Sequence, residues 1–263
     1  MTAPVPLPSS LGELVAGARW TRHEGGESGG IVHRLTFGDG CGLVLKYGAD
    51  RVADDVVAEA VRLRWATGRL PVAPLRWFAC GSGEAWLLTE ALPGPTGDEW
   101  LAREPGRWPA MVRRLARLMR RLHASPVSDC PFDAGHEVRL AAARRNVVDG
   151  LVDEEDFDAE RLGWTAADVL GEAEALAPTT PERAVTHGDF SLGNIVLDES
   201  GAVTGCIDIG RLGVADPYQD IAVLWNNLGD VGEDARRLLL DELDLDEPDE
   251  RRLRFHLLLD ELF

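Results

Sequence analysis

The chain has 263 residues, with 27 basic and 45 acidic side chains and a formal net charge of −18 at pH 7. The length suits one large domain or two lobes, and 27% charged with 45% hydrophobic residues is typical of a folded protein. The acid excess argues against nucleic acid and anionic membranes as partners, because both need a basic surface. It favours a cationic ligand.

Export and membrane insertion are not expected from this sequence. No apolar run approaches the roughly 18 residues of a transmembrane helix, and the first residues lack the pattern of a signal peptide. The four cysteines are far apart, with no CxxC pair and no Cys/His cluster: Cys41, Cys80, Cys130 and Cys206. We expect reduced thiols and a cytoplasmic protein rather than a disulfide framework or a zinc site.

The first ninety residues are predicted to be rich in β-structure. Four short apolar or alternating runs bounded by glycines predict strands, at 31–35, 43–47, 75–79 and 85–90. Between them, residues 54–67 have helical spacing, with acidic residues in the first turn and Gly68 at the end. The Pro- and Gly-rich stretch at 92–97 is the clearest linker in the chain.

After the linker, the sequence pattern predicts mostly helices. Residues 108–122 carry an apolar stripe, and we interpret the arginines off that stripe as a solvated face because the net charge is strongly negative. Further helices are expected at 137–149, 167–177, 216–228, 233–243 and 250–262, and short strands at 195–197 and 203–207. The pattern predicts an α+β, two-lobed, protein-kinase-like fold: a nucleotide-binding lobe at 1–91, a linker at 92–98 and a helical catalytic lobe at 99–263.

The strongest chemical signal is His187-Gly188-Asp189-Phe190-Ser191-Leu192-Gly193-Asn194, followed by Ile207-Asp208-Ile209-Gly210-Arg211. Asp189 and Asn194 have the D-x-x-x-x-N spacing of a kinase catalytic loop. Asn194 and Asp208 offer the hard oxygen ligands that suit Mg²⁺, and Asp189 can orient and deprotonate an attacking hydroxyl. Turn-forming residues capping strands are the alternative, but two ordered blocks at this spacing argue against it.

A cation for the phosphates of ATP is also available in the first lobe. Lys46 is the only lysine in the chain and lies in a predicted strand. Glu59, 13 residues later on the predicted helix, is placed to pair with it, although a solvated helix carboxylate is a serious alternative. The glycine-rich segment at 25–30 precedes the first clear strand and could cover the phosphates with its amides and the Ser28 hydroxyl, which by itself is a weak signal.

These motifs resemble those of the aminoglycoside 3'-phosphotransferases, bacterial antibiotic kinases with a protein-kinase-like fold. The resemblance runs from about Ser28 to Phe263. It rests on residues 186–194 and 205–216, on Gln219-Asp220-Ile221-Ala222, and on the ending Leu258-Leu259-Asp260-Glu261-Leu262-Phe263. The first two motifs specify the reaction, whereas the ending is much closer to this subfamily alone.

The resemblance implies a Mg²⁺- and ATP-dependent kinase that phosphorylates the 3'-hydroxyl of kanamycin- and neomycin-type aminoglycosides and so gives resistance. Its catalytic base would be Asp189, its Mg²⁺ ligands Asn194 and Asp208, and its ATP-binding residues Lys46, Glu59, Ser28 and the backbone of Thr89 and Ala91. Arg211 would help to order the active-site segment. The substrate-binding set would comprise Asp156, Asp158, Glu160, Arg211, Asp230, Asp260, Glu261 and the carboxylate of Phe263.

An acidic substrate cleft agrees with the net charge, because an aminoglycoside carries several ammonium groups at neutral pH. One departure concerns the substrate range. Where relatives commonly carry Arg-Asp, this chain has Asn226-Asn227. Our hypothesis is that the site is altered for one ring of the drug. Unchanged KM values across kanamycin, neomycin and ribostamycin after Asn226→Arg and Asn227→Asp would contradict it.

Two other classes of function stay open at this point. One is a related small-molecule kinase acting on another hydroxylated substrate, and the other is a nucleotide-binding pseudokinase without turnover. The C-terminal motif argues against the first, and the complete set of Lys46, Asp189, Asn194 and Asp208 argues against the second. A phosphohydrolase could share the acidic cluster but would not need the lysine-bearing lobe. We expect a monomer or a weak homodimer.

Overall fold

The computed structural model describes residues 4–23, 29–179 and 182–263. By its internal contacts the chain divides into two compact units, and each is described by itself. The first comprises Met1–Gly94 together with Thr204–Gly210, and the second comprises Pro95–Val203 together with Arg211–Phe263. Residues 204–210 join the first unit because the amide of Cys206 donates a hydrogen bond to the carbonyl of Pro71 (2.7 Å).

A five-stranded antiparallel sheet forms the centre of the first unit, with strand order β1-β2-β3-β5-β4. Its strands are β1 (Arg19–Arg22), β2 (Ile31–Thr36), β3 (Gly42–Ala49), β4 (Leu75–Gly81) and β5 (Glu84–Glu90). Central strand β3 pairs with β2 on one side and β5 on the other, so that Lys46 lies between Val32 and Leu87. This central place fixes the backbone of Lys46.

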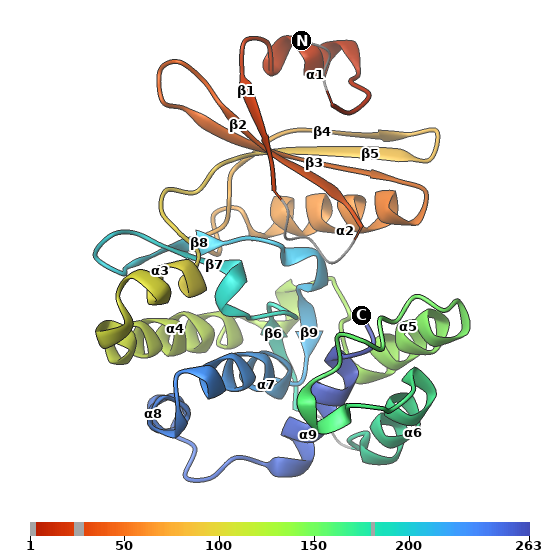
Figure 1. The fold of residues 1–263 in the computed structure, drawn as a ribbon, viewed down its shortest axis with the longest axis vertical. Helices are drawn as coiled ribbons and strands as arrows, with labels where there is room; N and C mark the ends of the chain where they lie inside the picture. The colour runs from red at the N-terminus through yellow and green to blue at the C-terminus, as the bar shows by residue number, and fades with distance from the viewer. Residues whose placement is uncertain (1–3, 24–28, 180–181) are drawn as a thin grey trace. The chain divides into compact units, whose positions relative to one another are not determined.

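The two faces of this sheet are covered by different helices (Figure 1). Helix α1 (Ser9–Leu14) contributes Leu11 to a core that includes Leu45 and Trp86. Helix α2 (Arg51–Ala66) packs along β3 and β5. Successive residues of a strand point to opposite faces, so Leu45 enters the α1 core while Lys46 faces α2.

The second unit is mainly helical. Its longer helices are α3 (Gly97–Arg103), α4 (Trp108–His123), α5 (His136–Val148), α6 (Ala166–Leu176), α7 (Tyr218–Asn227), α8 (Glu233–Glu242) and α9 (Glu250–Asp260). Single turns of 3-10 helix lie at η1 (Pro105–Arg107), η2 (Val127–Asp129), η3 (Ala159–Arg161), η4 (Leu192–Asn194), η5 (Ile209–Arg211) and η6 (Leu228–Asp230), of which η5 begins in the first unit. One core joins α5, α6 and α9 and includes Phe255 and Leu262, both fully buried.

Short strands hold the polar loop of the second unit. β6 (Ala184–Thr186) pairs antiparallel with β9 (Gly213–Ala215), with Thr186 opposite Gly213. The loop that leaves β6 runs from His187 through η4 into β7 (Ile195–Leu197), and β8 (Val203–Cys206) follows in the chain. The candidate catalytic residues of the second unit therefore leave the ends of paired or buried strands.

The predicted α+β class is confirmed: an antiparallel sheet is followed by a mainly helical part. Most predicted elements are present with ends shifted by up to three residues. Helix α2 begins at Arg51 rather than at 54, because Asp50 takes a positive φ of 53° and turns the chain from β3 into the helix. Helices α1 and α3 and strands β1, β6 and β9 were not predicted. No helix among the described residues has both the length and the apolar character needed to cross a bilayer.

Candidate active site

Lys46 is held by two carboxylates in the first unit. Its Nζ donates to Glu59 Oε2 at 2.7 Å and lies 3.2 Å from Asp208 Oδ1. Burial alone would lower the pKa of Lys46, but Glu59 and Asp208 outweigh it and raise the pKa above its ordinary value. The ammonium therefore remains charged at any working pH. Glu59 is 6% exposed, so it is the buried partner of Lys46 and not a solvated helix carboxylate.

Asp208 occupies an unusual backbone position. Its φ of 55° lies in the left-handed region, which costs free energy in a non-glycine residue and is found often at functional sites. The side chain is 55% exposed, whereas that of Glu59 is 8% exposed. Of the two carboxylates on Lys46, Asp208 is thus the one that solvent or a ligand can reach.

The predicted adenine-binding segment lies at the end of β5. Thr89 is 8% exposed and pairs with Val44 of β3. The Ala91 amide donates to the carbonyl of Gly42 (2.9 Å), so recognition of adenine by this N–H would require that bond to open. Ser28 lies outside the described residues.

In the second unit, Asp189 and Asn194 are in direct contact. The amide nitrogen of Asn194 donates to the Asp189 carboxylate (2.9 Å) and to the Asp189 carbonyl (3.1 Å). This arrangement uses the nitrogen of the amide and leaves its oxygen as the atom that can coordinate a cation. The Asp189 carboxylate is thereby oriented by a neutral donor.

Helix α7 fixes the loop that carries these two residues. Buried Asp220, in its first turn, accepts the amide protons of His187 and Gly188, both at 2.9 Å, and the preceding Gln219 donates to the Gly188 carbonyl (3.0 Å). At the other end of the helix, Asn227 accepts the amide proton of Leu192 (2.9 Å). One helix thus binds the loop on both sides of Asp189.

Two further features make this loop rigid. Gly188 has a φ of 91°, and a Cβ at this position would lie 2.4 Å from the carbonyl oxygen of Arg211. Only glycine fits here. His123 of α4 lies 2.9 Å from Asp220 through its Nε2, which adds a third polar partner to that buried carboxylate. The loop geometry is therefore specified by residues from α4 and α7 as well as by its own sequence.

The C-terminal residues are anchored in the second unit. Asn146 of α5 donates to the Leu262 carbonyl (2.8 Å), and the Phe263 amide donates to the Asp260 carbonyl (3.2 Å). The Asp260 side chain is 35% exposed and lies 3.7 Å from Arg211. Burial raises the pKa of the Asp260 carboxyl, while nearby Arg139 and Arg211 favour its charged form. Asp260 and Phe263 are thus fixed in place and still accessible.

Glu261 occupies a different environment from Asp260. Its side chain is only 8% exposed and accepts a hydrogen bond from Arg161 Nε (2.7 Å) and another from the Asp158 amide. Burial raises the pKa of the Glu261 carboxyl, and Arg161 opposes that shift. Arg161 also donates to the Asp158 carboxylate (2.8 Å). Glu261 therefore joins the C-terminus to the acidic segment, and its carboxylate is already occupied.

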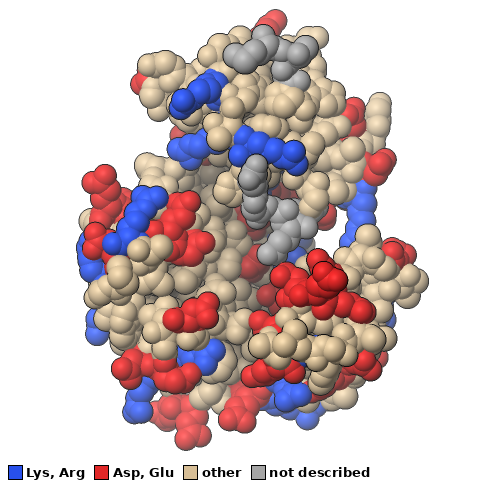
Figure 2. Space-filling view, in the orientation of Figure 1, with Lys and Arg blue, Asp and Glu red and all other residues tan. Residues whose placement is uncertain are grey.

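The remaining predicted substrate residues are acids at the surface. Asp156, Glu160 and Asp230 are exposed, and Asp158 is half-buried beside Arg161. Figure 2 shows one side of the molecule, and on the surface formed there by the second unit acidic side chains predominate over basic ones. A surface of this kind attracts a polycation through long-range electrostatics.

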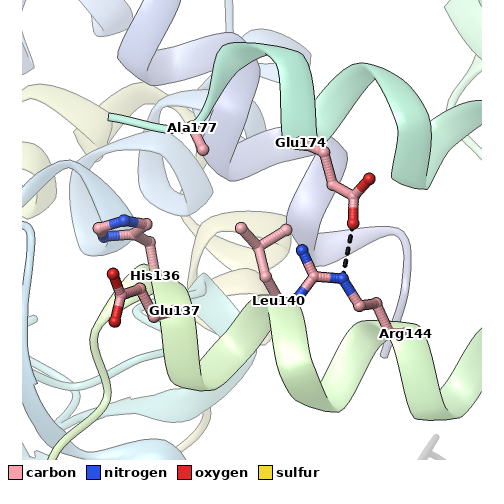
Figure 3. Close-up of a pocket in the computed structure, with 6 residues that line it drawn as sticks. All are labelled: His136, Glu137, Leu140, Arg144, Glu174 and Ala177. Carbon is pink, nitrogen blue, oxygen red and sulfur yellow. Dashed lines mark hydrogen bonds and ion pairs between the residues drawn. The ribbon is translucent and has the colours of Figure 1, made fainter. Parts of the chain in front are cut away.

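A separate pocket of about 400 Å³ lies between α5 and α6 (Figure 3). Its lining includes His136, Leu140 and the Arg144–Glu174 ion pair (2.6 Å). None of the predicted site residues lines it. We do not assign it to the active site.

Four residues of this site were not predicted from the sequence: His123, Arg139, Asn146 and Arg161. All lie in helices or turns where a polar residue is normally solvated. For Arg139 and Asn146 the sequence offers one indication of burial. Both lie at helical spacing from Ala143, on the same buried face of α5. The sequence places Asp220 in a family motif but does not show its role, because the loop that it holds is distant in the chain.

The chain is similar to known phosphotransferases over almost its whole length. The profile of the phosphotransferase enzyme family matches residues 19–256. An aminoglycoside 3'-phosphotransferase from Escherichia coli is 44% identical over 259 residues, covering 98% of this chain and 95% of the relative. The crystal structure of an aminoglycoside 3'-phosphotransferase of type VIII superposes with a TM-score of 0.87 at 35% identity, covering 97% of each chain.

A structure with bound ligands is also similar. An aminoglycoside phosphotransferase from Streptomyces rimosus in complex with ADP and streptomycin has a TM-score of 0.79 and 27% identity, covering 96% of this chain and 95% of the other. This relative holds a nucleotide and a cationic drug together.

Proposed function

The chain belongs to the aminoglycoside 3'-phosphotransferases, and from this we propose that it transfers the γ-phosphoryl group of ATP to the 3'-hydroxyl of kanamycin- and neomycin-type aminoglycosides. Resistance follows because the modified drug is inactivated. The observation that carries the reaction type is the carboxylate of Asp189, which Asn194 orients in a loop whose backbone is held by α7. The pseudokinase alternative would not require this arrangement.

The first unit supplies the cation for the nucleotide. Lys46 is held charged between Glu59 and Asp208, and its ammonium is suited to the α- and β-phosphates of ATP. Glu59 positions Lys46 and does not touch the nucleotide. The backbone of Thr89 and Ala91 would read adenine once the Ala91 amide is released from Gly42.

Asn194 and Asp208 would hold Mg²⁺. Among the described residues no cluster of three or more His, Cys, Asp or Glu side chains could hold a metal by itself. An amide oxygen and a carboxylate suit Mg²⁺, which usually takes one or two protein ligands and completes its shell with phosphate and water. When bound, the metal would neutralise the charge that develops on the transferred group.

Asp189 is the residue that acts on the acceptor. Its carboxylate would accept a hydrogen bond from the 3'-hydroxyl and orient the oxygen toward the γ-phosphorus, taking the proton as the new P–O bond forms and the bond to ADP breaks. The amide of Asn194 keeps this carboxylate in one orientation. Positioning of this kind can supply a large part of the rate acceleration.

Accessible acids of the second unit would bind the drug. Asp260 is half-buried and accessible, Phe263 is exposed and would offer its carboxylate, and Asp156, Asp158, Glu160 and Asp230 add negative charge. Glu261 would contribute mainly through Asp158 and the C-terminal turn, since Arg161 occupies its carboxylate. Arg211 would order this region through Asp260 and Phe263. We infer a cytoplasmic enzyme that acts as a monomer or weak homodimer.

Mapping the product tests the proposal. Kanamycin A is incubated with Mg-ATP and the enzyme, and the phosphorylated drug is isolated and examined by ³¹P–¹H correlation NMR. A correlation from phosphorus to the proton at the 3' carbon is expected. Phosphate on any other hydroxyl would contradict the proposed position, and turnover of streptomycin in place of kanamycin would favour the alternative of a related kinase with a different acceptor.

A further inference from the structure

A buried arginine lies beneath the C-terminal turn. Arg139 of α5 is 6% exposed. Its guanidinium Nη2 has no hydrogen-bond partner in the described part of the chain. A buried cation is costly unless it is paired with charge, so its position requires a physical explanation.

The neighbours of Arg139 are two predicted substrate-binding groups. Its Nη2 lies 3.6 Å from Asp260 Oδ1, and its guanidinium carbon lies 4.9 Å from the ring centre of Phe263. The half-exposed Arg211 repeats both contacts, at 3.7 Å from Asp260 and 4.9 Å from the Phe263 ring. Two cations therefore flank the same carboxylate and the same ring.

These ion contacts leave the acceptor atoms of Asp260 available. Distances of 3.6 and 3.7 Å exceed that of a hydrogen bond, so the two arginines supply charge without using a carboxylate lone pair. Burial lowers the pKa of Arg139 to about 10, aided by Arg211 and opposed by Asp260, so Arg139 remains charged near neutral pH. Burial raises the pKa of the Asp260 carboxyl, and the two arginines oppose that shift.

We propose that Arg139 is a positioning residue for substrate affinity, holding the Asp260 carboxylate and the Phe263 ring in place so that both face the aminoglycoside. The inference rests on the proposed function. It assigns Arg139 an effect mainly on drug binding, because Arg139 contacts Asp260 and Phe263, whereas its electrostatic interaction with Asp189 is weaker than that with Asp260.

The test compares Arg139→Met and Arg139→Lys with an Arg144→Met control. Arg144 lies on the same helix but is exposed and paired with Glu174. For Arg139→Met, KM for kanamycin A should rise about tenfold or more, with kcat and KM for ATP within about threefold of the unchanged enzyme. Arg139→Lys keeps the charge and should restore KM to within about threefold. Arg144→Met should match the unchanged enzyme.

A double-mutant cycle separates this role from a general packing defect. Because Arg139 acts in part through Asp260, the rise in KM caused by Arg139→Met should be clearly smaller in the Asp260→Asn background than in the unchanged enzyme. Independent, additive effects would overturn the proposal, and so would a KM for Arg139→Met within about twofold of the unchanged enzyme. If Arg139→Met does not fold by circular dichroism, Arg139→Gln takes its place. Failure of the unchanged enzyme to phosphorylate any aminoglycoside would instead refute the proposed function.

Discussion

Neutralising Glu59 should weaken the use of ATP without unfolding the protein. Glu59→Gln removes the charge of the carboxylate that accepts a 2.7 Å hydrogen bond from Lys46. Both side chains are largely buried, at 8% and 20% exposed, so solvent screens this interaction only partly. Lys46 then keeps Asp208, at 3.2 Å, as its charged partner and is drawn toward it.

The size of the effect follows from the strength of the interaction. A hydrogen bond to a charged group contributes about 1.5–3 kcal/mol, and about 1.4 kcal/mol corresponds to a factor of ten. We therefore expect kcat/KM for ATP to fall about 10- to 100-fold, while thermal unfolding changes little because Lys46 remains paired.

The assay is steady-state ADP release at saturating kanamycin A with Mg-ATP varied. Asp54→Asn is the matched control, because Asp54 lies on the same helix but is exposed, and it should behave like the unchanged enzyme within about twofold. A Glu59→Gln enzyme within about twofold of the unchanged one would refute the assignment of Glu59 as the positioning partner of Lys46.

Three other predictions concern the loop and the core. Asn227→Ala removes the acceptor of the Leu192 amide and should lower kcat about tenfold while neighbouring Asn226→Ala does not; equal kinetics of the two variants would refute the role of Asn227. Gly188→Ala introduces a Cβ 2.4 Å from the Arg211 carbonyl at a φ of 91°, so turnover should be nearly abolished, and substantial residual activity would show that the loop can relax. His256 is 2% exposed, and burial, followed by Arg139, Arg252 and His136, lowers its pKa well below 6.5. Because the unfolded state binds this proton more readily, stability should fall as pH drops below about 6.5. His256→Leu should remove that part of the pH dependence in urea titrations, and an identical pH dependence would contradict the prediction.

The amphipathic helices and the chemical motifs could be predicted from the sequence because each has a local signal. The apolar stripe of α4 and the spacing of Asp189, Asn194 and Asp208 are examples. Strands β6 and β9 could not be predicted in this way. Each has three residues, too few to show alternation, and their pairing joins segments nearly thirty positions apart. These two strands form because the fold brings their segments side by side.

The supports of the site were the least predictable part. Asp220 and Arg139 look from the sequence like ordinary polar residues of helices, yet the fold buries both and turns one toward a loop and the other toward the C-terminus. Asn227 illustrates the same point. From the sequence it suggests a changed drug site, whereas in the structure its side chain holds the catalytic loop. Whether Asn226 and Asn227 alter the drug range stays a prediction.

The most direct measurement of the central claim is ADP release with Mg-ATP and either kanamycin A or tobramycin, which lacks the 3'-hydroxyl. The proposed enzyme releases ADP with kanamycin A and none above background with tobramycin, and the kanamycin signal is lost in Asp189→Asn. Equal release with both drugs would contradict transfer to the 3'-hydroxyl.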